Sequence, residues 1–211
     1  MNAAKQIVSE AIVENLDILK FSPSATVRVA DLGCSVGPNT FFAVQNILEA
    51  IELKCQNQGL DSQIPEFQVF FNDHTSNDFN SLFSSLFPNR SLHIVHSSFA
   101  IQWLSRVPKK VVDRSSHAWN KGRIYYPSAA DEVVEAYSAQ CAEDMARFLQ
   151  ARAQEIADGG LMILIFPARL DGIRHSQFSN NILFDMLGRC LMDMAKKARN
   201  GNWAVHSYPG V

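Results

Sequence analysis

The sequence has little excess of charge of either sign and few of the residues that break regular structure. Its 19 Lys and Arg residues are balanced by 21 Asp and Glu residues, which leaves a formal net charge of −2. A general nucleic-acid binder is disfavoured because there is no basic excess to bind phosphate groups. The 10 glycines and 8 prolines in 211 residues are too few for a fibrous chain, and a hydrophobic content of 47% supplies a core. One folded domain over residues 1–211 is expected.

Long apolar runs and paired cysteines are also missing. The longest apolar run, residues 161–168, is far shorter than the ~20 residues of a membrane span. The N-terminus lacks the charged-then-apolar layout of a signal peptide. Cys34, Cys55, Cys141 and Cys190 are scattered, a spacing that fits neither a zinc site nor a disulfide framework. We therefore expect a cytoplasmic protein without a membrane partner.

Helical and strand-like segments alternate along the chain. Helices are expected over residues 7–19, 38–55, 133–153 and 178–195. Short apolar runs predict strands at residues 27–31, 67–71, 92–95 and 161–166. Strands that are apolar on both faces form a mostly parallel sheet covered by helices, so the sequence predicts an α/β fold.

The loop after the first expected strand is the most informative stretch. It reads Asp31-Leu32-Gly33-Cys34-Ser35-Val36-Gly37-Pro38-Asn39 and leads into a helix whose first N–H groups can face a ligand. It matches neither the phosphate-binding P-loop nor the Gly-x-Gly-x-x-Gly fingerprint, which disfavours a nicotinamide-dependent oxidoreductase. An acid before two glycines suits a ligand with an ammonium group, such as S-adenosylmethionine (SAM); plain turn glycines are the alternative.

Polar residues also follow the neighbouring strands. Asp73 ends the second expected strand, where a carboxylate can accept hydrogen bonds from both hydroxyls of a ribose. An ordinary turn acid is an equally weighted alternative. Ser97 and Ser98 end the third strand, so these side chains gather at the edge where open α/β sheets bind ligands.

A series of motifs continues from this loop in a fixed order. They are Asp31-Leu32-Gly33-Cys34-Ser35-Val36-Gly37-Pro38-Asn39-Thr40, Phe67-Gln68-Val69-Phe70-Phe71-Asn72-Asp73, Asn77-Asp78-Phe79-Asn80, Ser91-Leu92-His93-Ile94-Val95-His96-Ser97-Ser98, Trp103-Leu104-Ser105, Trp119-Asn120-Lys121-Gly122 and Gly159-Gly160-Leu161-Met162. With these motifs the sequence, from about Ala3 to Lys197, resembles the plant SABATH methyltransferases. That family uses SAM to methylate small carboxylic acids such as salicylate, jasmonate or benzoate, and in some members xanthine nitrogens.

The resemblance implies a SAM-dependent O-methyltransferase with a Rossmann-like sheet and a partial helical cap. Residues 105–130 and 170–200 would contribute to that cap on the substrate side. The residues implied to bind SAM are Asp31, Gly33, Cys34 and Asn39 at its methionine end, Asp73 at its ribose and His74 beside its adenine. The family usually has Leu at the position of His74. A homodimer is also compatible with the resemblance.

Phe99, Gln102 and Trp103 match family positions that contact the methyl acceptor. The aromatic rings offer flat walls, and the Trp103 N–H would help to hold a carboxylate. Simple packing along a helix face is the alternative, because Phe99 and Trp103 are four residues apart. Asn120 matches a position described as a magnesium ligand in some members, but one amide oxygen is weak evidence for a hard cation, so magnesium is treated as optional.

Methyl transfer to a carboxylate needs positioning more than acid–base chemistry. A carboxylate is already ionised at neutral pH, so no general base is required. His93 and His96 are therefore expected to be structural.

The chain departs from the family pattern in three places. By the resemblance, the family's upstream lid would lie before residue 1, residues 81–86 would have to replace both a helix and an adenine-contacting loop, and residues 198–211 match nothing familiar. We therefore expect methyl transfer to a small plant acid, with weak SAM binding and poor turnover. A shortened isoform that only binds SAM or a partner is the alternative.

Overall fold

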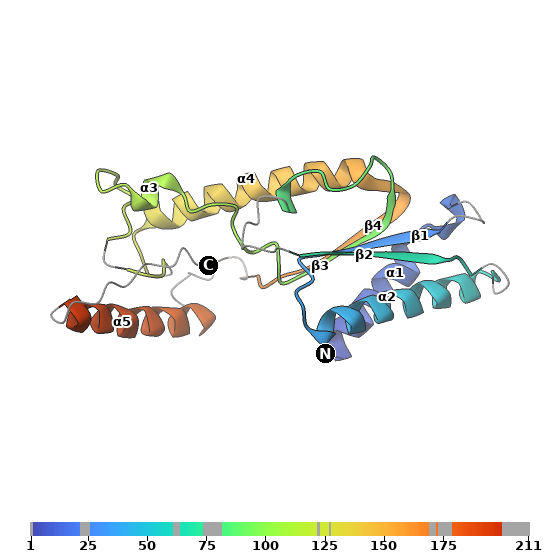
Figure 1. The fold of residues 1–211 in the computed structure, drawn as a ribbon, viewed down its shortest axis with the longest axis horizontal. Coiled ribbons are helices and arrows are strands. Elements are labelled where there is room, and N and C mark those ends of the chain that lie inside the picture. Colours follow the sequence, from blue (N-terminus) through green and yellow to red (C-terminus); the bar gives the residue numbers. More distant parts are fainter. Residues whose placement is uncertain are drawn as a thin grey trace. The chain divides into compact units, whose positions relative to one another are not determined.

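The computed structural model describes residues 2–21, 26–60, 64–73, 82–121, 123–126, 128–168, 172 and 179–199. In chain order the elements are α1 (Asn2–Asn15), η1 (Ile18–Lys20), β1 (Val27–Leu32), α2 (Pro38–Asn57), β2 (Phe67–Asn72), β3 (Leu92–Ser98), α3 (Lys109–Val112), α4 (Asp131–Glu155), β4 (Ile156–Ile165) and α5 (Ser179–Arg199), as Figure 1 shows. Two compact units can be distinguished, Met1–Ile101 with Ala146–Phe166, and Gln102–Met145 with Pro167–Val211. The expected cap segments, 105–130 and 170–200, both fall in the second unit.

The described strands of the first unit pair in parallel, in the order β2-β1-β3-β4. From β1 the chain passes through α2 to β2 on one side, and it then returns to β3 on the other side of β1. The direction of strand addition therefore reverses between β1 and β3. Open α/β sheets bind ligands in the crevice at the carboxyl ends of such a pair. The predicted α/β fold with a parallel sheet is confirmed.

The core of the first unit lies between the sheet and the helices α1 and α2, which cover one face (Figure 1). Ile12 of α1 and both Ile47 and Ile51 of α2 are completely buried, because apolar residues recur at helical spacing on the face toward the sheet. The end of α4, from Ala146 onward, lies on the opposite face, where Phe148 is buried. The sheet is thus covered on both sides, as its apolar strands require.

β4 begins earlier than expected, at Ile156 rather than residue 161. The Asp158-Gly159-Gly160 segment therefore lies within the strand. Gly159 has a φ of +82°, and a Cβ on Gly160 would lie 2.8 Å from the His93 carbonyl oxygen. The register between β3 and β4 shifts at this place. The two glycines allow an irregularity inside a strand, where the sequence suggested a turn before one.

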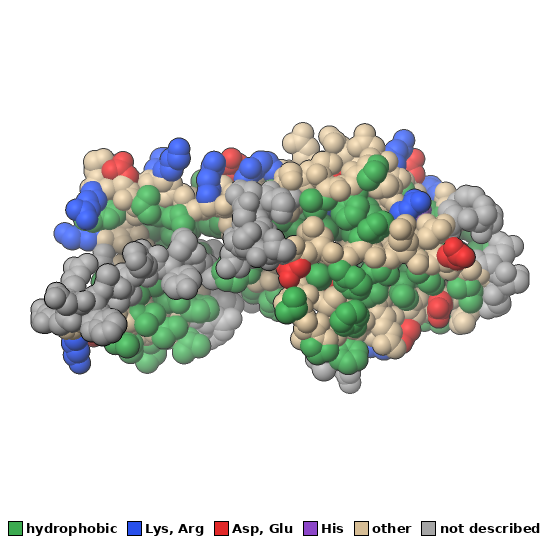
Figure 2. Space-filling model, in the orientation of Figure 1, with side chains coloured by type: hydrophobic (Ala, Val, Ile, Leu, Met, Phe, Trp, Pro, Cys, Tyr) green, Lys and Arg blue, Asp and Glu red, His purple; other side chains and the backbone are tan. Residues whose placement is uncertain are grey.

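The second unit contains α3, the first part of α4 and α5. Ser128 donates a hydrogen bond to the Asp185 carboxylate of α5, and the Tyr125 and Phe184 rings lie 5.2 Å apart between centroids. Apolar side chains gather on α5 (Figure 2). Those that are exposed are Ile182, Leu183, Met186, Leu187 and Met194. No helix in the described part of the chain is long and apolar enough to cross a membrane.

Candidate functional site

The loop after β1 is fixed in a conformation that requires glycine at its first position. Gly33 has a φ of +73°, and a Cβ there would lie 2.2 Å from the Cβ of Ala100. The backbone N–H groups of Gly33 and Cys34 both donate to the Asn72 carbonyl, at 2.7 and 3.1 Å. The loop is therefore attached to the end of β2.

The second glycine of the loop has a different environment. Gly37 is the N-cap of α2, and Pro38 is the first residue of the helix, as predicted. A Cβ on Gly37 would have no atom of the described part of the chain within 4 Å. The space beside Gly37 at the start of the helix is open, so a bound group can approach the backbone there.

A cavity of about 390 Å³ lies at this end of the sheet and is lined by four of the predicted cofactor residues, Asp31, Gly33, Cys34 and Asn39. The other lining residues are Ser35, Thr40, Ala43, His96, Ser98 and Phe99. Residues from β1, the loop, α2 and β3 thus converge on one cavity. The sequence marked Ser98 only as a strand-end residue and gave no role to Thr40.

Asp31 is a buried acid with a specific partner. Its Oδ1 lies 2.8 Å from Nδ1 of His96 on β3, and both side chains are only 4% exposed. The two residues are direct neighbours in the β1–β3 register. Ser97 adds a second link, because its hydroxyl donates to the Leu32 carbonyl at 2.9 Å. The carboxyl end of β1 is therefore held by two successive side chains of β3.

Asp73 lies at the same edge of the sheet as Asp31. It directly follows β2, whose last residue Asn72 is the register partner of Leu32 on β1. Burial, followed by the charges of Asp31 and Asp73, raises the pKa of the Cys34 thiol. Both carboxylates are therefore close enough to act on the loop. The predicted residue His74 lies outside the described residues.

A second, mainly apolar cavity of about 480 Å³ adjoins the first. Residues from α1, including Lys5 and Val8, and Phe42 of α2 line it. The residues shared by both cavities are Asn39, Ala43, His96, Ser98 and Phe99. Phe99, which lines both cavities, has a φ of +55° and is 60% exposed.

Gln102, Trp103 and Asn120 belong to the second unit. Trp103 is 37% exposed, and its role toward the acceptor stays a prediction, as does that of Gln102. The Asn120 Oδ1 is buried, and none of the described residues donates a hydrogen bond to it. Within the described ranges no group of three His, Cys, Asp or Glu side chains is arranged to hold a metal ion, and one amide oxygen does not complete the ligand set of a hard cation.

The sequence matches the model of a protein family described as SAM dependent carboxyl methyltransferase, over residues 1–86 and 81–208. The chain belongs to this family. It is 42% identical to loganic acid O-methyltransferase of Catharanthus roseus, over 99% of this chain and 62% of that protein. It is 39% identical to farnesoic acid carboxyl-O-methyltransferase of Arabidopsis thaliana, over 92% of this chain and 60% of that protein.

The fold agrees with this family. A solved structure, loganic acid methyltransferase with SAH (S-adenosylhomocysteine), matches with a TM-score of 0.84 and 41% identity, over 94% of this chain and 62% of that chain. The predicted Rossmann-like methyltransferase fold and the resemblance to the SABATH family are thereby confirmed.

The chain is shorter than the relatives that it matches. It spans about 62% of the length of loganic acid O-methyltransferase. The alignment with that protein runs over 231 positions, more than the 211 residues of this chain, so the relative has positions within the aligned region that are missing here. The two stretches matched by the family overlap at residues 81–86, in agreement with the expectation that this segment stands in for two segments of the family.

Proposed function

We propose that the protein transfers the methyl group of SAM to the carboxylate of a small plant acid, of the salicylate, benzoate or jasmonate type. The observation that carries the proposal is the cavity lined by Asp31, Gly33, Cys34 and Asn39 at the carboxyl end of β1. It lies at the reversal of strand order, in a chain whose fold is similar to a methyltransferase solved with SAH.

The residues present fit the cofactor by their chemistry. Asp31 supplies a buried negative charge for an ammonium group, and the open space beside Gly37 lets a ligand approach the start of α2. Asp73, which follows β2 at the same edge, would bind the ribose hydroxyls. When bound, SAM would supply an activated methyl group on a positively charged sulfur.

The protein's contribution to the reaction is positioning and exclusion of water. The acceptor is already ionised at neutral pH, so no side chain has to remove a proton. Holding the carboxylate oxygen in line with the methyl group at near-attack distance can supply about 7–11 kcal/mol of the barrier. Phe99, at the junction of the two cavities, is the described residue best placed to pack against an apolar acceptor.

The acceptor class is supported by the relatives. Two of them are named for loganic acid and farnesoic acid, both carboxylic acids. The mainly apolar second cavity suits a molecule with a hydrocarbon body. Magnesium at Asn120, a homodimer and a cytoplasmic location are further proposals, supported only by the resemblance and the scattered cysteines.

Transfer of a radiolabelled methyl group from SAM to a panel of plant acids tests the proposal. Labelled methyl esters that form with the wild-type protein and decrease strongly with Asp31→Asn are the expected result. Binding of SAH without any labelled ester would favour the alternative of a binding isoform. If the protein shows no SAH binding and no methyl transfer, the proposal and the alternative of a binding isoform are both contradicted.

A further inference from the structure

His96 is a polar residue in the middle of the site that the transfer reaction does not use. It lies on β3 directly opposite Asp31 in the sheet, is 3% exposed, and lines both cavities. Its Nδ1 lies 2.8 Å from Asp31 Oδ1. A carboxylate only accepts hydrogen bonds, so the ring donates its Nδ1–H and this contact fixes the tautomer.

This hydrogen bond restricts the direction in which the Asp31 carboxylate can point. A buried carboxylate without a partner turns toward any available donor, or it draws water into the site. With Oδ1 held by His96, the carboxylate plane is fixed and Oδ2 is left for a second donor. Asp31 also lines the 390 Å³ cavity, so that second donor can come from a ligand.

We infer that His96 is a positioning residue that orients the Asp31 carboxylate toward the ammonium group of the cofactor's amino-acid end. The inference rests on the proposed function and assigns a role to a histidine that the sequence indicated as merely structural. It distinguishes His96 from His93, which lies on the same strand with a similar exposure of 7% but lines neither cavity. His93 instead accepts the Arg28 backbone N–H at 2.9 Å.

The two histidines give a matched set of variants. In His96→Asn the amide nitrogen can take the place of Nδ1 and keep the bond to Asp31. In His96→Gln the amide reaches the place of Nε2 instead and leaves Asp31 without its donor. His93→Leu removes an equally buried histidine of β3 and controls for a general loss of stability.

Two ligands separate an effect on Asp31 from a general effect on the site. SAH carries the ammonium group, whereas 5′-methylthioadenosine has the same nucleoside without the amino-acid end. Isothermal titration up to millimolar ligand, on full-length chains shown by circular dichroism to be folded, measures both affinities. In His96→Gln the Asp31 carboxylate is no longer oriented, so its charge-assisted hydrogen bond to the ammonium group of SAH is lost. SAH binding should then weaken about 10- to 100-fold.

The expected pattern is that His96→Gln weakens SAH but not 5′-methylthioadenosine, while His96→Asn and His93→Leu bind both ligands as the wild type does. Unchanged SAH affinity in His96→Gln, equal losses for both ligands, or a His96→Asn variant as weak as His96→Gln would overturn the inference alone. A wild-type protein that binds neither ligand would overturn the proposed function, and this inference with it.

Discussion

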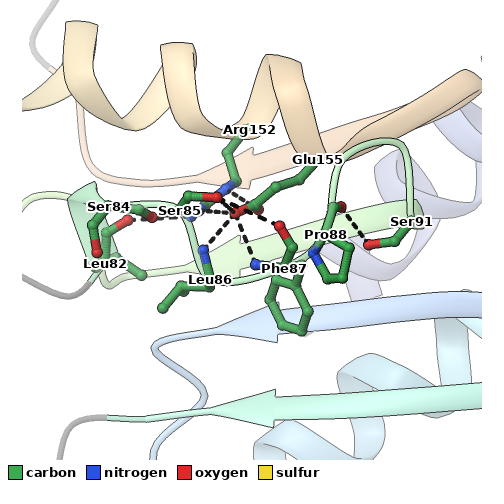
Figure 3. Close-up of polar contacts among 9 residues, drawn as sticks. All are labelled: Leu82, Ser84, Ser85, Leu86, Phe87, Pro88, Ser91, Arg152 and Glu155. Atoms are coloured by element: carbon green, nitrogen blue, oxygen red, sulfur yellow. Dashed lines mark hydrogen bonds and ion pairs between the residues drawn. The ribbon is translucent and has the colours of Figure 1, made fainter.

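Arg152 and Glu155 form an ion pair inside the protein, with Nε and Oε2 2.8 Å apart and both side chains completely buried. Figure 3 shows that the pair also binds the chain segment before β3. Glu155 accepts the backbone N–H groups of Leu86 and Phe87, and Arg152 donates to the carbonyls of Leu82 and Ser84. The segment from Leu82 to Phe87 is therefore fixed to the end of α4.

Glu155→Gln should destabilise the protein by about 3–5 kcal/mol, because the variant leaves the Arg152 cation buried without a counter-charge. Urea unfolding followed by circular dichroism measures the loss. Glu143→Gln is the control on the same helix, since its pair with Arg106 is half exposed and should contribute under about 1 kcal/mol. Equal effects of the two substitutions would show that burial of the pair does not matter.

Gly33→Ala and Gly37→Ala should behave differently although both lie in one loop. Alanine at Gly33 meets Ala100 at 2.2 Å and has to adopt a φ of +73°, so a loss of about 1–3 kcal/mol is expected. Alanine at Gly37 meets no atom of the described residues within 4 Å, but it is a poorer N-cap than glycine, so a smaller loss of under about 1 kcal/mol is expected. SAH affinity should fall because the added Cβ fills the space beside the start of α2. Thermal unfolding and titration measure the two effects. A Gly37→Ala variant that is as destabilised as Gly33→Ala would contradict this description of the loop.

His93 should make the protein less stable in mild acid. Burial, followed by the charge of Arg28, lowers the pKa of His93, and its Nδ1 already accepts the Arg28 N–H. The unfolded chain therefore binds a proton more readily, so stability decreases as the pH falls through about 6.5 toward the lowered pKa.

His93→Asn tests this effect because its amide oxygen can still accept the hydrogen bond but does not titrate. It should lose less stability than the wild type between about pH 7.5 and 5.5 in urea unfolding. The exposed His117→Asn variant is the control and should keep the wild-type dependence. If His93→Asn also keeps the wild-type pH dependence of stability, the effect arises from another titratable group.

Cys34 should react slowly with iodoacetamide at neutral pH. Burial and the nearby carboxylates of Asp31 and Asp73 raise the pKa of its thiol, which leaves little thiolate. Peptide mass spectrometry should find slower labelling of Cys34 than of the exposed Cys190, and SAH should slow only Cys34. Protection of both residues, or of neither, would place the ligand elsewhere.

The chain as it stands should bind SAM weakly and turn over slowly. Its segment at residues 81–86 is matched to two parts of the family, so contacts that relatives make with the nucleoside are expected to be missing. Calorimetric titration measures the affinity. A micromolar dissociation constant for the 211-residue chain would show that the remaining contacts suffice.

Local patterns in the sequence predicted most of the sheet and the loop, and tertiary contacts decided the rest. β1 and α2 were placed within two residues because an apolar run, two glycines and Pro38 mark their ends. Gly159 and Gly160 are typical of a turn, and the sequence predicted one there. No local pattern reveals that the His93 carbonyl of the neighbouring strand lies close to Gly160. The pairing of Asp31 with His96 depends on strand register, which no local pattern specifies.

The bonds from His96 and Ser97 to the end of β1 have a consequence for the energetics of recognition. They join β1 and β3 through the protein's own side chains, so they restrain the walls of the cleft. The entropy lost on docking then falls mainly on the incoming nucleoside rather than on the protein. A rigid receptor of this kind discriminates by shape, and small changes in the amino-acid end of a ligand should alter its affinity steeply.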